Sequence, residues 1–146
     1  MELNTPGEFD LYLFVRFWTP EACLQEYTPA CQSLNASDWA TYSLTLHGLW
    51  PEYAKNISGS IYPEECWSNN ATFWDSVSNV DAGVTPQFTE RWQQYAPEYN
   101  YGLATHEWTK HGTCYSDELI EAAGNPQAVA AAQANYFHDQ LTLCQD

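Results

Sequence analysis

The chain has 146 residues and a mass of 16.6 kDa, which is the size of one domain, and we expect residues 1–146 to form a single one. Lys and Arg total 4 against 19 Asp and Glu, so the formal net charge is −15. This charge excludes a basic protein that coats nucleic acid, because such binding depends on many cationic phosphate contacts. It does not exclude an enzyme that holds one phosphate. The apolar run at residues 11–15 is too short to span a bilayer, and we expect no membrane contact.

The first predicted element is a strand at residues 9–17, which are rich in aromatic and β-branched side chains. Thr19 and Pro20 are expected to end this strand. A short polar loop should follow between Cys23 and Cys31.

A second strand is predicted at residues 42–46, where polar and apolar side chains alternate. This alternation places His47 at the end of the strand, on its polar face. Gly48 and Pro51 then break the pattern, so we expect a loop from there to about Cys66.

Helices are predicted in the rest of the chain, with starts marked by Asn70, by Thr85 and Pro86, and by Asn125 and Pro126. Their expected ranges are 71–77, 85–95, 105–114 and 126–143. Together with the two strands, these helices predict an α+β fold in which an antiparallel sheet packs against helices. Because an isolated two-stranded ribbon is marginally stable, either strands escape the pattern or part of the fold lies outside these residues.

The cysteines and glycosylation sequons favour an oxidising compartment. Five cysteines occur without a Cys-x-x-Cys pair, which argues against a zinc ribbon or a thioredoxin-like site. Three Asn-x-Ser/Thr sequons begin at Asn35, Asn56 and Asn70. We therefore expect a secreted or lysosomal/vacuolar protein, with Met1 standing after a removed signal peptide. A cytosolic protein with free thiols is the alternative.

The odd cysteine count leaves Cys144 over. It could pair with chain absent here, pair with another molecule, or remain a buried thiol.

A block of ionisable residues at 106–111 carries two of the chain's four histidines. It is not the His-Glu-x-x-His zinc motif, because the second histidine comes one residue too late. On a helical wheel its polar groups fall within an arc of about 140°. These groups are His106, Glu107, Lys110 and His111. One helix face would thus combine imidazoles, a carboxylate and an ammonium. A solvated polar helix face is the alternative, which the clustering of half of the histidines with one of the two lysines disfavours.

Such a face suits phosphodiester cleavage without a metal or other cofactor. A base must take the proton of the 2′-hydroxyl, an acid must protonate the leaving oxygen, and a cation must offset the transition-state charge. Two histidines can act as base and acid at mildly acidic pH. His47 is the candidate for the second histidine, and His138 is expected at the surface.

Two segments resemble the active-site motifs of the ribonuclease T2 family of acid, secreted endoribonucleases. The first is Leu46-His47-Gly48-Leu49-Trp50-Pro51, and the second runs from His106 to Cys114. They occur in the order found in the family. Weaker similarity covers Phe9-Asp10, the Cys23–Cys31 loop and Tyr136-Phe137.

The resemblance implies a role for each matched residue. His111 would be the general base, His47 the general acid, and His106 a phosphate ligand. Glu107 and Lys110 would stabilise the transition state. The base of the RNA would stack on Trp50, with Glu52 and Tyr62 lining the same pocket.

The resemblance also implies products and disulfides. RNA would be cleaved to 2′,3′-cyclic phosphate ends and then to 3′-phosphates. The paired cysteines would be Cys23 with Cys31 and Cys66 with Cys114, and a bridge closing a loop as long as the second contributes about 4 kcal/mol.

Two features depart from the family. Leu103-Ala104 stand where the family has Phe-Trp, so an aromatic of the second base site is missing unless Tyr99 or Tyr101 replaces it. The family also continues past the helix at 125–143 with further strands. We therefore expect a fold that lacks its C-terminal strands and a second polypeptide that completes it, with Cys144 as a candidate link.

The acidity predicts an acidic optimum, because carboxylates that repel RNA begin to lose their charge near pH 4 to 5. The expected partner is single-stranded RNA, held by a few phosphate contacts and by stacking. Two rival functions remain: a catalytically weak binding or storage protein on the same fold, and a metal-dependent hydrolase. Sensitivity to a chelator separates the latter from the ribonuclease.

Overall fold

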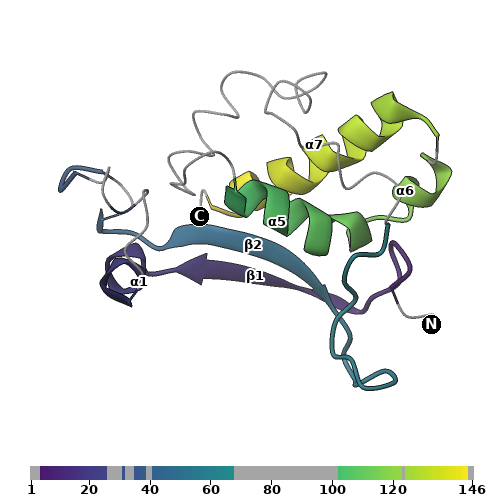
Figure 1. The fold of residues 1–146 in the computed structure, drawn as a ribbon, viewed down its shortest axis with the longest axis horizontal. Helices are drawn as coiled ribbons and strands as arrows, with labels where there is room; N and C mark the ends of the chain where they lie inside the picture. Colours follow the sequence, from purple (N-terminus) through teal and green to yellow (C-terminus); the bar gives the residue numbers. More distant parts are fainter. Residues whose placement is uncertain are drawn as a thin grey trace.

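The computed structural model describes residues 4–25, 31, 35–38, 41–67, 102–122 and 124–144. The helices expected at 71–77 and 85–95 lie outside the described residues. The described elements are β1 (Leu11–Phe17), α1 (Thr19–Gln25), β2 (Thr45–Glu52), α5 (Gly102–Lys110), the 3₁₀ helix η3 (Gly112–Cys114), α6 (Glu118–Glu121) and α7 (Pro126–Leu143). Helices α5 and α7 lie on the β2 side of the β1–β2 ribbon (Figure 1). The fold is therefore α+β, as the sequence predicts.

Strand β2 is longer than the sequence predicts and carries a bulge. It pairs antiparallel with β1, with Val15 opposite Gly48 and Arg16 opposite Leu46, so that His47 is the extra residue. The expected strand at residues 42–46 was therefore wrong at both ends: β2 begins at Thr45 and does not end at His47. The extra residue interrupts the simple alternation, and the backbone pairs on as far as Glu52, past a proline that cannot donate to the ladder. A bulge redirects a side chain, and here the side chain is an imidazole.

Strand β1 ends before Thr19 and Pro20, as expected, and helix α1 starts at Thr19, where the sequence predicted no helix. Cys23 lies in α1, so the predicted polar loop begins inside a helix. Its disulfide with Cys31 is formed, as is the one between Cys66 and Cys114. Both pairings implied by the family resemblance are confirmed.

Helix α5 begins three residues earlier than predicted and passes into η3 after Lys110. The backbone N–H of His111 still donates to the carbonyl of Glu107 over 3.0 Å, so His111 keeps its helical position. Trp108 and Gly112 lie on the buried side, as the helical wheel predicts.

Helix α7 matches its predicted range of 126–143. Its start is capped by Asn125, whose side-chain oxygen accepts hydrogen bonds from the N–H groups of Gln127 and Ala128. It buries a row of side chains against the core, namely Val129, Ala132, Tyr136, Phe137 and Leu141. Cys144, at the C-cap, is 6% exposed and belongs to the same core.

One buried hydroxyl connects the elements that carry the candidate site. The hydroxyl oxygen of Tyr136 lies 3.1 Å from the carbonyl oxygen of Leu49 in β2 and 3.3 Å from that of Glu107 in α5. Its single proton is shared between two acceptors. Helix α7 thereby sets the distance between β2 and α5.

None of the helices in the described part of the chain is long and apolar enough to cross a membrane.

We predict that Gly112→Ala lowers the free energy of unfolding by about 1–3 kcal/mol, because the position is overpacked. A Cβ there would lie 2.4 Å from the Trp108 ring and 3.0 Å from the Tyr136 ring. Gly102→Ala is the matched control, since no atom lies within 4 Å of its added Cβ. Urea unfolding measures both; equal stability of the two variants would contradict the packing argument.

Tyr136→Phe should cost about 0.5–1.5 kcal/mol, since the hydroxyl's contacts with the Leu49 and Glu107 carbonyls are lost while the ring is kept and the Glu107 carbonyl retains the N–H of His111. Thermal unfolding followed by circular dichroism measures the loss. Tyr42→Phe serves as the control because Tyr42 is exposed. A Tyr136→Phe melting curve that superimposes on that of the wild type would show that the shared hydrogen bond contributes little.

Candidate active site

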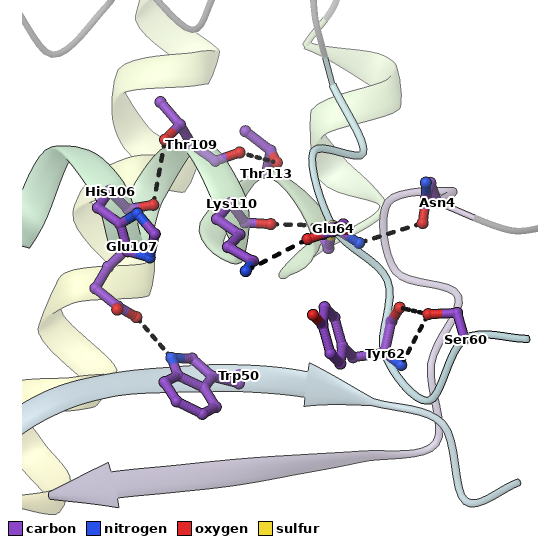
Figure 2. A network of polar contacts seen from close by, with 11 residues as sticks. Asn4, Trp50, Ser60, Tyr62, Glu64, His106, Glu107, Thr109, Lys110 and Thr113 are labelled. Atoms are coloured by element: carbon purple, nitrogen blue, oxygen red, sulfur yellow. Dashed lines mark hydrogen bonds and ion pairs between the residues drawn. The ribbon is translucent and has the colours of Figure 1, made fainter. Parts of the chain in front are cut away.

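Strand β2 and helix α5 face one another with the motif residues between them. His47 and Trp50 come from β2; Glu107 and Lys110 come from α5, and His111 follows directly. Figure 2 shows the Glu107 side chain extending from α5 to the indole of Trp50. The two motifs, far apart in sequence, therefore form one cluster.

Glu107 lies at the centre of this cluster and is 0% exposed. Its Oε2 accepts a hydrogen bond of 2.7 Å from Nε1 of Trp50. Its Oε1 lies 3.3 Å from Nε2 of His47. The carboxylate thus spans from α5 to both ring systems of β2.

The two histidines of the second motif differ in environment. His111 is 5% exposed and its ring stacks on Trp50, with centroids 4.9 Å apart and planes at 20°. His106 is exposed, and its ring centroid lies 6.3 Å from that of His111. The polar helix face is therefore turned toward β2 at Glu107 and His111, which argues against a merely solvated face.

Lys110 is bound to the loop that follows β2. Its Nζ lies 3.5 Å from Oε2 of Glu64 and 5.5 Å from the ring centroid of Tyr62. Its backbone carbonyl accepts a hydrogen bond of 2.9 Å from the N–H of Glu65. The Cys66–Cys114 disulfide closes the same junction. This loop brings Tyr62 to 6.2 Å from the His111 ring, measured between centroids.

Sequence reasoning missed two neighbours of the cluster. The Phe17 ring stacks on His47 with centroids 4.1 Å apart and planes at 17°. The position of Phe17 at the end of β1 predicts contact with His47 only once the pairing register of β1 and β2 is known. Nothing in the sequence pattern singles out Glu64 as the partner of Lys110.

The other predicted residues lie away from the imidazoles or in exposed positions. Glu52 ends β2 opposite Leu11, and burial raises its pKa. His138 is exposed, as expected. Asn35 and Asn56 are exposed, and their glycosylation stays a prediction. The remaining expected residues, Asn70, Tyr99 and Tyr101, lie outside the described part.

Burial sets the protonation of the two inner histidines. Desolvation, with a smaller contribution from His106, lowers the pKa of His47 to about 4. Desolvation, followed by the charges of Lys110, His106 and His47, lowers the pKa of His111 to about 3. Both imidazoles are therefore neutral at pH 7 in the free protein. Oε1 of Glu107 lies 3.3 Å from Nε2 of His47, which is close enough for the carboxyl group to accept a proton-bearing Nε2 as a donor.

A group of three residues could also hold a cation. Within the described ranges, the ligand atoms of His106, Glu107 and His111 lie within 4.8 Å of one another. The same atoms are the ones that acid–base chemistry would use. Two imidazoles of different pKa, a buried carboxylate and a lysine ammonium can move protons and bind a phosphate with no metal.

Comparison with known proteins gives a consistent result. The profile of the Ribonuclease T2 family matches residues 9–146. Ribonuclease DdI of Dictyostelium discoideum is 35% identical over 115 residues, covering 77% of this chain and 43% of that protein. Extracellular ribonuclease LE of Solanum lycopersicum is 28% identical over 143 residues, covering 97% of this chain and 53% of that protein.

Solved structures show the same fold. The crystal structure of Actibind, a T2 ribonuclease, aligns with a TM-score of 0.64 at 22% identity, covering 92% of this chain and 50% of that one. A mutant of RNase MC1 in complex with 5′-UMP aligns with a TM-score of 0.56 at 24% identity, covering 94% and 57%.

The chain spans about half the length of the curated relatives that it matches. The match of the family profile nevertheless runs through both motifs and through every described element from β1 to α7. The chain therefore belongs to the ribonuclease T2 family.

Proposed function

We propose that this chain carries the active site of a metal-independent endoribonuclease that acts on single-stranded RNA. The observation that carries the proposal is the convergence of His47 and His111 on Trp50 and Glu107. Two imidazoles from different elements, one edge-on to the Trp50 indole and one stacked on it, support acid–base chemistry at two atoms of one phosphodiester. The names of the relatives, all ribonucleases, support the same reaction class.

In this proposal His111 takes the proton of the 2′-hydroxyl, and the 2′-oxygen then attacks the phosphorus. His47 donates a proton to the leaving 5′-oxygen. The products are a 2′,3′-cyclic phosphate and a free 5′-hydroxyl, and water later opens the ring to a 3′-phosphate. Exposed His106 holds the phosphate, while Lys110 and Glu107 stabilise the transition state.

The base of the RNA would be held by aromatic stacking. Tyr62 lies beside Lys110 and close to His111, which supports a base next to the cleaved phosphate. Trp50 and Glu52 belong to the same proposed pocket. Single-stranded RNA suits this arrangement because its bases are free to stack.

We also propose a partner chain and a location for the protein. A further polypeptide would complete the sheet along β1, where Leu11, Leu13 and Phe17 are exposed. A disulfide to it through Cys144 would require the end of α7 to open, since Cys144 lies in the core. Two disulfides and exposed sequons support a secreted or lysosomal/vacuolar location.

The pKa values predict an acidic optimum. The reaction needs His47 protonated and His111 neutral, so kcat/KM should peak between the pKa values of about 3 and about 4. Above the pKa of His47 the rate should fall as pH rises, because the acid is lost.

Phe17→Ala, which exposes His47 to water, should move this fall to higher pH, whereas Leu24→Ala on the exposed face of α1 should not. A rate that stays constant from about pH 4 to about pH 8 would contradict the assignment.

The proposed reaction is tested by cleavage of a short single-stranded RNA at about pH 5, with EDTA present. We expect 2′,3′-cyclic ends, and a loss of about a hundredfold or more in His47→Ala and in His111→Ala. His138→Ala is the matched control, since His138 is exposed on α7.

A folded wild type that binds RNA without cleaving it would favour the binding or storage protein. Activity abolished by EDTA would favour the metal-dependent hydrolase.

A further inference from the structure

Glu107 is a buried carboxylate, and its loss of hydration on folding must be offset by contacts within the protein. It is 0% exposed, and a buried charge is costly unless donors or opposite charges surround it. The indole N–H of Trp50 lies 2.7 Å from Oε2, the length of a charge-assisted hydrogen bond. This contact joins α5 to β2 at the point where the proposed reaction takes place.

Gly48 provides the space for this contact. A Cβ on Gly48 would lie 1.8 Å from Oε2 of Glu107 and 2.6 Å from Nε1 of Trp50. The backbone of Gly48 does not have the left-handed φ that favours glycine, so its conformation is open to other residues. The position is therefore restricted by the carboxylate above it. It also directly follows the bulged residue His47.

The two oxygens of Glu107 are thereby given different partners. An indole nitrogen only donates, so Oε2 of Glu107 is the acceptor of this contact, and a proton on that oxygen would have to point away from the indole. Any proton shared by Glu107 and His47 must lie between Oε1 and Nε2, which are 3.3 Å apart. Trp50 thus determines which oxygen serves the histidine.

We propose that Trp50 and Gly48 are positioning residues that act through Glu107, so that Trp50 contributes to the reaction even where no base stacks on it. This inference rests on the proposed ribonuclease function. It predicts that the loss in a Trp50 variant is a loss of kcat that is common to all bases. A residue that only stacked a base would change KM, and would do so to a different extent for each base.

A double-mutant cycle separates the two roles. Trp50→Phe keeps an aromatic ring and removes the N–H. We expect kcat to fall about tenfold or more on each single-stranded homopolymer, because a displaced catalytic group is costly. In a Glu107→Ala background the same change should cost less than about twofold, because the group it positions is gone. Trp18→Phe is the matched control, since Trp18 is exposed and follows β1.

Losses from Trp50→Phe and Glu107→Ala that multiply in the double variant would overturn the proposal. So would a change in KM alone that depends on the base. Gly48→Ala gives a second test: it should lower kcat as Trp50→Phe does, while Gly102→Ala leaves it unchanged. Circular dichroism of each variant shows whether it is folded.

An NMR measurement tests the contact without any cleavage. Among the indole N–H signals of the 7 tryptophans, the one absent in Trp50→Phe belongs to Trp50. Glu107→Gln should shift that signal upfield, because the charged acceptor is replaced by a neutral one. An unmoved signal would refute the positioning contact. If Glu107→Gln moves the signal but the wild type cleaves no RNA, the proposed function is refuted and the contact between Trp50 and Glu107 stands.

Discussion

The hydroxyl of Tyr136 is the constraint on which the site depends, because it lies between a backbone carbonyl of β2 and one of α5. The two proposed acid–base groups belong to these two elements, and their separation is set by a third, α7. Burial raises the pKa of Tyr136 well above its ordinary value, so the hydroxyl keeps its proton and remains a donor. The Cys66–Cys114 disulfide adds a covalent restraint at η3, directly after α5, by joining it to the loop that follows β2. A noncovalent and a covalent connection thus hold α5 in place.

The same burial that positions the histidines determines how they respond to pH. Each imidazole is packed against a ring, His47 against Phe17 and His111 against Trp50. Because their folded pKa values of about 4 and about 3 lie below the ordinary value, the neutral forms stabilise the folded state at neutral pH. That contribution is lost as the pH falls from about 6.5 through the folded values. Acid therefore brings the proposed acid into its reactive form and weakens the fold, which the disulfides counteract.

Local patterns predicted α5 and α7, missed the short helices α1 and α6, and failed at the bulge. The Ala-rich run after Asn125 and Pro126 predicted α7 to the residue, because a cap, a helix-favouring composition and a proline at the first position agree. The helical wheel also separated the polar face of α5 from Trp108 and Gly112. The end of β2 was misjudged since Gly48 and Pro51 are strand breakers locally, whereas pairing with β1 keeps them in the ladder. Glu64 was missed because its partner is distant in sequence.

By itself, the sequence identified the members of the candidate site: two short motifs, their histidines, Glu107 and Lys110. Its resemblance to the family implied the two cysteine pairs, which the structure contains. The residue types in a motif and the spacing between them are local features, so they can be read without knowledge of the fold. Only the tertiary structure decided how those groups share their charges. It buried Glu107, gave one of its oxygens to Trp50 and the other to His47, and placed Gly48 beneath the carboxylate. Contacts between β2 and α5 depend on strand register and helix packing, and these arise from long-range burial that no single segment encodes.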